Sequence, residues 1–358
     1  MQQSQTWSER PIQLSIGVFL LAPLAVLEGA RTSSAVNVAQ SQAQALMFLN
    51  FYDYGYAISM VLFGFWYILT GYLVRGALYA LHKEMKNRAV AEVVASSTGN
   101  HGAAVACAGR LLNVRVKIFL PRKANPIKQS RIRDFGGEIV EYGKDISEAF
   151  EGANEYASRM GAFLLNDATN PDVPAGTATI GVEIVEQLPD VAAIWVPMGD
   201  TALIRGIASA GKYLRPGVRV IGIQAERAPA YYLSWKQGVA VSTDTCDTIA
   251  DGLATRIAIE ENVAAIRELV DDIRLVSEAQ VLDAIQHLLV KEHIVAEPAG
   301  AAVTAAWLAD STFEANGPVV LLVTGANISE PILCQALAGQ HHPVNHEIVP
   351  GSCSGGEE

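Results

Sequence analysis

The sequence predicts an α/β protein with two parallel β-sheets that are each covered by helices, preceded by a hydrophobic helical segment. Three observations predict this class. Apolar strand-length segments alternate with helix-length segments from about residue 80 onward, glycine and hydroxyl residues stand at the strand–helix junctions, and two long uncharged runs precede residue 75. Such alternation is typical of βα units, whose helices pack on the faces of a parallel sheet.

The alternating region divides into two sets of elements, which we take as a small domain at about residues 80–165 and a large domain at about residues 166–338. In the small domain, strands are expected at Ala89–Ala95, Val114–Leu120, Glu138–Tyr142 and Ala162–Leu165, with helices at Ala103–Leu112, Pro126–Phe135 and Ser147–Met160. In the large domain, strands are expected at Ala192–Val196, Val218–Gln224, Ile273–Val276 and Val319–Val323. A ligand cleft is expected between the two domains.

Residues 1–74 have a different character. Pro11–Leu27 is an uncharged run of 17 residues, and Tyr54–Val74 is an uncharged run of 21 residues. The second run is close to the ~20 residues that a membrane-spanning helix needs, so we expect a transmembrane segment there. A buried strand and helix of a soluble protein is the alternative. The helix is expected to continue past Gly76 to Met85, because a single glycine costs a helix only about 1 kcal/mol.

The location of the protein depends on this segment. Four basic residues follow the second uncharged run closely, and basic residues tend to stay on the cytoplasmic side of a membrane; they are Arg75, Lys83, Lys86 and Arg88. A spanning segment therefore predicts a membrane-associated protein whose α/β portion is cytoplasmic. If the segment does not span, the whole protein is expected to be cytoplasmic.

Composition excludes several classes of function. The net charge of −11, with no basic patch, argues against a nucleic-acid partner. The four cysteines are widely separated, so neither a disulfide framework nor a Cys-based metal site is expected; they are Cys107, Cys246, Cys334 and Cys353. The last residues, 339–358, are polar and end in a Ser/Gly-rich stretch, and we expect them to be disordered.

The most informative motif is Ser97–Gly102 (STGNHG), between an expected strand and an expected helix. A helix N-terminus presents unpaired N–H groups and the positive end of the helix dipole, which suits an anion. Hydroxyl and amide side chains add hydrogen-bonding groups there, and glycines allow a ligand to approach the backbone. An ordinary capped helix is the bland alternative, and the full six-residue run makes it the weaker one.

This run and its surroundings resemble the threonine/serine dehydratase and serine racemase family of pyridoxal-phosphate enzymes, the fold type II group. The resemblance extends over roughly residues 75–337 and rests on further segments in the same order: Arg75–Leu78, Gly136–Val140, Pro174–Ile180, Asp251–Ala254, Glu297–Ala302 and Thr324–Asn327. The segment before them, around Tyr52–Tyr56 and Gly64–Trp66, resembles a family of uncharacterised multi-pass bacterial membrane proteins.

The resemblance implies pyridoxal phosphate as cofactor and L-threonine or L-serine as substrate. In that family a lysine two residues before the Arg-Gly-Ala sequence forms a Schiff base with the cofactor. Here that position is Leu73, preceded by Tyr72 at the aromatic position. Leucine has no amine, so no Schiff base forms there. Lys83 is ten residues further along, about 15 Å on a continuous helix, which is too far to replace it.

The same resemblance assigns the phosphate anchor to the loop after the strand Ala192–Val196. The family has four consecutive glycines there, of which only Gly199 remains. Asp200 would repel a phosphate if it pointed inward, so we expect it to cap a helix that starts at Thr201. The rest of the loop is Ala202 and Leu203. Phosphate binding is expected here, in a weakened form.

The remaining site residues are also assigned by resemblance. Thr324 corresponds to the hydroxyl residue that faces the pyridine nitrogen, Asn100 to the contact of the 3′-oxygen, and Glu297 to a carboxylate near the cofactor, with a helix N-cap as its alternative role. The expected loop for the substrate carboxylate is Ser97, Thr98, Gly99, Asn100 and His101. Thr98 stands where racemases have an acid/base serine, which favours a dehydratase. The family's metal ligands fall at Gln224 and Ala230, which are not acidic, so no metal is expected.

Two classes of function follow. The first is a threonine/serine ammonia-lyase that releases a 2-oxo acid and ammonia, impaired by the leucine at position 73; a serine racemase-like activity is a further alternative. The second is a membrane-tethered remnant that binds pyridoxal phosphate or a phosphate without turnover. The assembly is left open between a homodimer and a tetramer.

Overall fold

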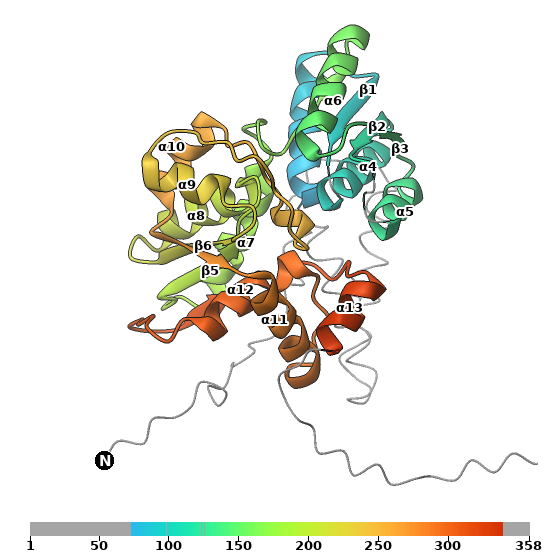
Figure 1. Ribbon diagram of the computed structural model, residues 1–358. Helices are drawn as coiled ribbons and strands as arrows, with labels where there is room; N and C mark the ends of the chain where they lie inside the picture. The colour runs from blue at the N-terminus through green and yellow to red at the C-terminus, as the bar shows by residue number, and fades with distance from the viewer. Residues whose placement is uncertain (1–72, 98, 123, 125, 339–358) are drawn as a thin grey trace, which may run out of the picture.

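The computed structural model describes residues 73–97, 99–122, 124 and 126–338 (Figure 1). Within this part of the chain the predicted α/β class is confirmed, because the strands form two four-stranded sheets in which every neighbouring pair is parallel. We call the first sheet with its helices the N-terminal unit and the second sheet with its helices the C-terminal unit. In Figure 1 the N-terminal unit runs from blue to green and the C-terminal unit from yellow-green to red.

The N-terminal unit has the strand order β3-β2-β1-β4. Its strands are β1 (Glu92–Ser96), β2 (Arg115–Leu120), β3 (Glu138–Glu141) and β4 (Phe163–Leu164), and its helices include α4 (Asn100–Leu112), α5 (Pro126–Asp134) and α6 (Ile146–Met160). Alternate residues of β1 face opposite ways, as the period of a strand requires. Val93 packs with the residues of α4, whereas Val94 packs with the buried alanines of α6. The sheet therefore lies between two helix layers.

The C-terminal unit has the strand order β7-β6-β5-β8. Its strands are β5 (Ala193–Pro197), β6 (Arg219–Ala225), β7 (Asp272–Val276) and β8 (Val319–Leu321). Residues from α7 (Pro174–Gln187), α8 (Ala202–Leu214), α9 (Ala230–Gln237) and α10 (Glu260–Leu269) join one core cluster. Residues from the 3₁₀ turn η4 (Asp251–Leu253), α11 (Glu278–Lys291), α12 (Pro298–Ala309) and α13 (Glu330–Leu337) join the other. This sheet also lies between two helix layers.

Residues 73–87 form one helix, so the predicted continuation past Gly76 to Met85 is confirmed. Its buried face consists of Ala77, Ala80 and Leu81, which join the core of the N-terminal unit. Gly76 lies so close to the chain before α7 that an added Cβ would stand 2.4 Å from the carbonyl oxygen of Val173. The residue type at this position therefore follows from a close backbone contact.

The predicted membrane segments lie outside the described residues, apart from the last two residues of Tyr54–Val74. No helix among the described residues combines the length and the apolar character that crossing a bilayer requires. The C-terminal tail expected to be disordered, residues 339–358, also lies outside the described part.

Two predicted helix starts need correction. The helix expected from Ala103 begins at Asn100, so the Asn-His-Gly part of the motif forms its first turn. The reason is a side-chain cap from the strand end, described below. The helix expected from Thr201 begins at Ala202, because Thr201 has a left-handed backbone conformation with φ of 81° and ends the preceding turn.

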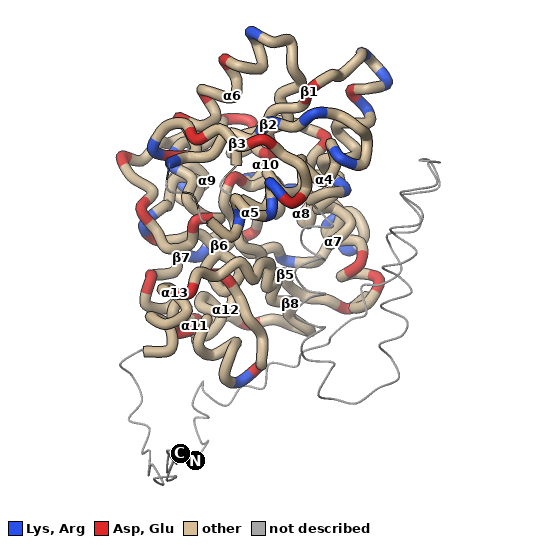
Figure 2. The backbone as a smooth tube through the Cα atoms, turned by 90° about the vertical axis from the view of Figure 1, so that its right-hand side faces the viewer, with Lys and Arg blue, Asp and Glu red and all other residues tan. Residues whose placement is uncertain are grey.

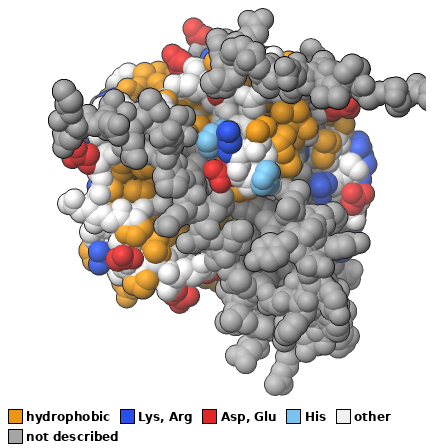
Figure 3. Space-filling view, turned by 90° about the horizontal axis from the view of Figure 1, so that it is seen from below, with side chains coloured by type: hydrophobic (Ala, Val, Ile, Leu, Met, Phe, Trp, Pro, Cys, Tyr) orange, Lys and Arg blue, Asp and Glu red, His pale blue; other side chains and the backbone are white. Residues whose placement is uncertain are grey.

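Acidic and basic residues are interspersed along the backbone of both units (Figure 2). Seen from below, apolar side chains lie beside acidic, basic and histidine side chains on one face of the molecule (Figure 3).

Ion pairs also connect the helix 73–87 to the segment around α7, where Arg75 pairs with Glu183 at 3.2 Å and Lys83 pairs with Asp172 at 2.7 Å.

Candidate functional site

The turn between β1 and α4 is held by a side chain of the motif itself. The Oγ of Ser97 accepts hydrogen bonds from the backbone N–H groups of Gly99 at 2.9 Å and Gly102 at 3.0 Å. This bonding pairs two N–H groups that a helix N-terminus would otherwise leave open. Ser97 is buried, and its hydroxyl oxygen faces the turn. The structure thus gives Ser97 a role in shaping the loop, while Thr98 lies outside the described residues.

Asn100 connects the N-terminal unit to the C-terminal unit. Its Nδ2 donates a hydrogen bond to Glu297 Oε1 at 3.1 Å, and its Oδ1 accepts one from Asn327 Nδ2 at 2.8 Å. Glu297 Oε2 also accepts from the backbone N–H of Asn327 at 3.2 Å. Residues about 200 positions apart therefore meet where the two units face each other. The motif Ser97–Gly102 and the motif at Glu297, which the sequence predicted to share a site, are brought together.

Glu297 does not act as a side-chain cap. It occupies the N-cap position of α12, yet its carboxylate makes no capping hydrogen bond to that helix. Glu297 is instead 2% exposed, and its carboxylate accepts hydrogen bonds from Asn100 of the N-terminal unit and from the backbone N–H of Asn327 in its own unit. The Glu297 carboxylate has room here because residue 325 is a glycine: a Cβ at Gly325 would stand 2.2 Å from Glu297 Oε1. Glu297 is thus the N-cap residue of α12, as the alternative interpretation expects, but its side chain does not cap that helix.

His101 is a buried neutral side chain. Its Nε2 lies 3.1 Å from the carbonyl oxygen of Leu165, so Nε2 carries the proton and donates a hydrogen bond to that oxygen. Burial lowers the pKa of His101, which keeps the ring neutral. The Nδ1 atom has no hydrogen-bond partner among the described residues and lies 3.7 Å from Asp167 Oδ2. An acceptor nitrogen is thus left facing a carboxyl group.

The loop between β5 and α8 places a carboxyl group at a helix N-terminus. Asp200 Oδ1 accepts a hydrogen bond from the backbone N–H of Ala202 at 2.9 Å, so the expected capping role of Asp200 has a bond that supports it. Gly199 packs against the chain at η4, where a Cβ would stand 2.3 Å from the carbonyl oxygen of Gly252. Leu203, the last residue of the predicted anchor, lies in the first turn of α8 and packs on the core.

Asp200 is one of a pair of carboxyl groups. Burial, and then the neighbouring carboxyl of Asp167, raise the pKa of Asp200 to about 7. Burial also raises the pKa of Asp167, which shares a hydrogen bond with Asp200. Arg205 lies nearby, but its guanidinium donates to the backbone carbonyl of Ala168 at 3.2 Å. The Asp200 carboxyl is therefore protonated below about pH 7 and ionises as pH rises through that value.

Lys128 is the site residue that sequence reasoning missed. It lies on α5, it is 3% exposed, and its Nζ donates to both carboxylate oxygens of Asp251, at 2.8 and 2.9 Å. Glu297 Oε2 lies 3.5 Å from the same Nζ. The sequence holds only a weak signal for it: Lys128 lies four residues before Ile132, on the same face of a polar helix whose buried side the structure identifies.

Three further residues were predicted for the site: Thr324, Leu73 and Tyr72. Thr324 is buried, 7% exposed, in the chain that follows β8. Leu73 is half-buried at the first described position of the helix 73–87, while Tyr72 lies outside the described residues.

Gln224 and Ala230, where the resemblance places the family's metal ligands, have other roles in the structure. Gln224 is fully buried, and its Oε1 accepts a hydrogen bond from the backbone N–H of Tyr232 at 2.8 Å. Ala230 begins α9. Across the part of the chain that the structure describes, no group of three or more His, Cys, Asp or Glu side chains could hold a metal ion.

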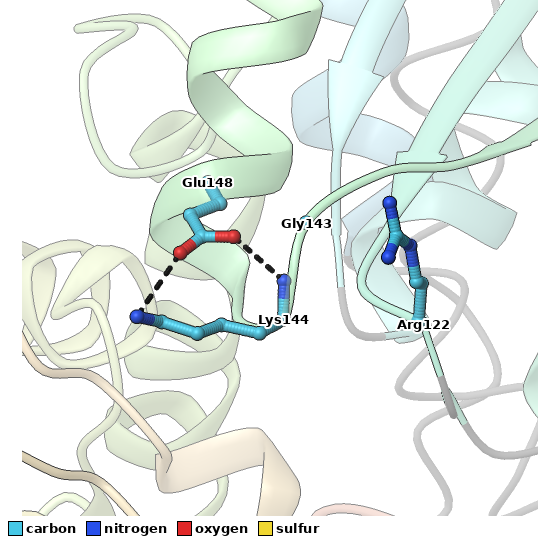
Figure 4. Close-up of a pocket in the computed structure, with 4 residues that line it drawn as sticks. All are labelled: Arg122, Gly143, Lys144 and Glu148. Atoms are coloured by element: carbon cyan, nitrogen blue, oxygen red, sulfur yellow. Dashed lines mark hydrogen bonds and ion pairs between the residues drawn. The ribbon is translucent and has the colours of Figure 1, made fainter.

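A separate pocket of about 300 Å³ opens beside β2 and β3 (Figure 4). It is lined by Arg122, Gly143, Lys144 and Glu148, and the Glu148 carboxylate is held by Lys144 through its backbone N–H at 2.9 Å and its Nζ at 3.1 Å. None of these residues was predicted to bind a ligand. None of the lining residues belongs to the cluster around Glu297, so the pocket is a separate feature of the N-terminal unit.

Comparison with known families gives two matches. Residues 70–325 match a family described as "Pyridoxal-phosphate dependent enzyme". Residues 9–80 match a family described as "Domain of unknown function (DUF4386)". The two matches overlap at residues 70–80, in the region of Leu73.

Characterised relatives match the same region. The chain is 36% identical over 255 residues to the L-threonine ammonia-lyase of Geobacter sulfurreducens, covering 71% of this chain and 63% of that protein. It is 33% identical to the catabolic L-threonine dehydratase TdcB of Escherichia coli K12, covering 71% and 78%. The chain thus spans less than two thirds of the first of these relatives.

Solved structures of related enzymes superpose on this chain. Maize serine racemase superposes with a TM-score of 0.68 at 27% identity, covering 75% of this chain and 83% of that one. The processed form of threonine deaminase isoform 2 from Solanum lycopersicum gives a TM-score of 0.67 at 31% identity, covering 75% and 79%. The two parallel sheets match those of the fold type II enzymes.

Proposed function

This chain belongs to the pyridoxal-phosphate-dependent enzyme family, and on that premise we propose that its cleft binds pyridoxal phosphate and L-threonine or L-serine, as an ammonia-lyase with impaired turnover. The family and its threonine deaminase members depend on pyridoxal phosphate. The observation that carries the proposal is the hydrogen bond between Asn100 and Glu297, which brings two predicted cofactor contacts together between the two units.

The residues present fit the non-covalent part of such a site. Thr201 is 1% exposed, and its Oγ1 has no hydrogen-bond partner among the described residues, although it lies at the N-terminus of a 13-residue helix. A phosphate oxygen there would pair with this hydroxyl and with the helix dipole. Asp200 opposes this fit when it is charged and permits it when it is protonated. Asn100 and Thr324 would face the ring.

The chemistry of the reaction divides between cofactor and protein. When bound, pyridoxal phosphate supplies the electron-withdrawing ring that stabilises negative charge on the α-carbon of an amino acid. The chain supplies the binding groups: the N-terminus of α4 for a carboxylate, and the Asn100–Glu297 pair for orientation. It lacks an amine at position 73 that could accept the α-proton, so we infer slow turnover.

Two other functions remain candidates, each with an observation in its favour. Leu73 favours a protein that binds pyridoxal phosphate or phosphate without turnover. The superposition with maize serine racemase favours a racemase-like reaction. Position 98 holds a threonine where racemases use a serine, and this difference weighs against a racemase-like reaction.

The test combines cofactor binding with product formation. We expect saturable binding of one pyridoxal phosphate per chain in equilibrium dialysis. We expect release of 2-oxo acid from L-threonine to be about 10²–10⁴-fold slower than in the Escherichia coli relative, the range attributed to a positioned acid–base group. Chiral analysis of L-serine reports racemisation in the same samples. Failure to bind pyridoxal phosphate saturably would contradict the proposal, and a rate equal to that of the relative would contradict the impairment.

We further propose that residues 1–74 attach the protein to a membrane with the α/β portion on the cytoplasmic side. The uncharged runs Pro11–Leu27 and Tyr54–Val74, followed by basic residues, support this. Full-length protein is expected to sediment with membranes and to need detergent for extraction. Recovery as a monodisperse species in a high-salt soluble fraction would rule out the attachment and would leave a cytoplasmic protein.

A further inference from the structure

The Lys128 side chain extends from α5 of the N-terminal unit to carboxyl groups of the C-terminal unit. Among the lysines that the structure describes, it alone falls in the buried class, and its side chain passes directly over the turn that begins α4. A Cβ added at Gly99 would stand 2.1 Å from Lys128 Cδ. The bare backbone of Gly99 is therefore what allows the lysine stem to cross the Ser97–Gly102 motif and reach the C-terminal unit.

The amine of Lys128 ends among the groups proposed to contact the cofactor. Its Nζ lies 3.5 Å from Glu297 Oε2, while the other oxygen of the same carboxylate accepts a hydrogen bond from Asn100 at 3.1 Å. Asp251 holds the Nζ from a second side at 2.8 Å. Lys83, by contrast, is exposed and pairs with Asp172 on the outside of the helix that carries Leu73.

We propose that Lys128 is the amine that captures the aldehyde of pyridoxal phosphate in this chain, in place of the amine that Leu73 lacks. The inference rests on the proposed binding of pyridoxal phosphate. The Lys128 ammonium first gives a proton to the carboxylate of Glu297 or Asp251. The nitrogen then forms a bond to the aldehyde carbon, and the carbonyl oxygen leaves as water with the two hydrogens of the amine. The same carboxylic acid returns its proton to the nitrogen, so a protonated C=N group and a carboxylate remain, and no oxidant or reductant is needed.

The charges around Lys128 make its capture of an aldehyde dependent on pH. Burial opposes the charged form, but Glu297 and Asp251 together raise the pKa of Lys128 above its usual value. The free amine is therefore scarce at neutral pH, and capture is expected to become faster as pH rises. The protonated C=N group keeps one positive charge at the same place, so both carboxylates retain their partner after capture. In this proposal Lys128 anchors the cofactor and is assigned no role in turnover.

The test is reductive trapping on the full-length protein. The protein is incubated with an equimolar amount of pyridoxal phosphate, reduced with borohydride, digested and analysed by peptide mass spectrometry. We expect one adduct per chain, on Lys128. Lys128→Arg keeps the cation but has no primary amine, so its adduct should fall at least 10-fold. Lys83→Arg, the matched control at an exposed lysine, should leave the adduct unchanged.

Each alternative result separates the two proposals. An adduct on another single lysine, spread over several lysines, or undiminished in Lys128→Arg would overturn the role of Lys128. Saturable binding of pyridoxal phosphate without a reducible adduct would also overturn it, while leaving the proposed function intact. Absence of saturable binding would remove both. Mapping the unaltered protein does not depend on whether any variant folds.

Discussion

Asp200 lies in the loop after β5, where the resemblance expects glycines, and its carboxyl group pairs with that of Asp167, which follows β4. A carboxyl group whose pKa is raised by folding stabilises the protein fully below its unfolded pKa, near 4, and loses that contribution as pH rises through the folded pKa. For Asp200 the folded pKa is about 7. In the folded protein the charge on Asp200 appears as pH rises through about 7 and opposes a phosphate at the N-terminus of α8, so affinity for phosphate esters should fall as pH rises through that value.

Asp200→Asn is therefore expected to stabilise the protein at pH 8 and to change it little at pH 4. The amide oxygen can still accept the hydrogen bond of Ala202, and the amide carries no charge. At about 1.4 kcal/mol per pK unit, the gain in the free energy of unfolding should be roughly 1–3 kcal/mol at pH 8. Denaturant unfolding at both pH values measures it, with the exposed Asp244→Asn as control. A pH-independent difference would contradict the assignment.

Prediction from sequence was uneven at the scale of single residues. The motifs around Asn100 and Glu297 could be paired in advance, because the resemblance assigns both to one site and the structure joins them at 3.1 Å. Lys128 could not be found by the same reasoning, since lysines are expected on the surface. Its burial depends on Asp251, which is 123 positions away. Contacts of that range are set by the packing of the two units.

At the scale of elements, the helices α7 and α8 are held together by glycines. A Cβ at Gly206 would stand 2.1 Å from Thr177 Oγ1 and 2.4 Å from the carbonyl oxygen of Pro174. A Cβ at Gly181 would stand 2.6 Å from the carbonyl oxygen of Ile207. Backbone atoms cannot move aside as the tip of a flexible side chain can, so these helices would have to separate.

Gly206→Ala is expected to lower the free energy of unfolding by about 1–3 kcal/mol, the usual cost of overpacking a core. Gly217→Ala is the matched control, because no atom lies within 4 Å of its added Cβ. That variant should remain within about 0.5 kcal/mol of the parent. Chemical denaturation of the two variants side by side makes the comparison. Equal stability of both would show that α7 and α8 can shift at little cost.

The strands were well predicted because each is an apolar run bounded by turn residues, and all eight described strands fall at the expected places within a few residues. Helix starts were less well predicted. The start of α4 depends on where the Ser97 hydroxyl points, and the start of α8 depends on the left-handed backbone of Thr201. Both are local geometric choices that periodicity of apolar residues does not contain.

At the scale of the whole molecule, several polar contacts join the two units. Asp145, the N-cap of α6, pairs with Arg256 of the C-terminal unit at 3.1 Å, and Arg75 pairs with Glu183. Lys128 adds its contact with Asp251. Because these contacts are spread along the boundary, loss of one unit exposes polar groups of the other. We therefore expect the units to unfold together.

A chain of residues 73–338 is expected to fold and to unfold in one transition. Its tryptophans, at positions 195, 235 and 307, all lie in the C-terminal unit, whereas far-ultraviolet circular dichroism reports both units. Coincident denaturation curves from tryptophan fluorescence and circular dichroism would show one cooperative unit. Two separated midpoints would show that the units unfold independently, whereas an unfolded product would assign residues 1–72 a part in the fold.

The bonds of Asn100 have a consequence for how tightly any ligand is held. In the conformation described, its amide is already engaged by Glu297 and Asn327 across the boundary. A ligand that needs this amide can bind only the fraction of molecules in which those bonds are broken. Its measured dissociation constant is then its intrinsic constant divided by that fraction. A protein whose cleft opens in one molecule out of a hundred would thus need about a hundredfold more ligand, so occupancy in solution is governed by how often the cleft opens.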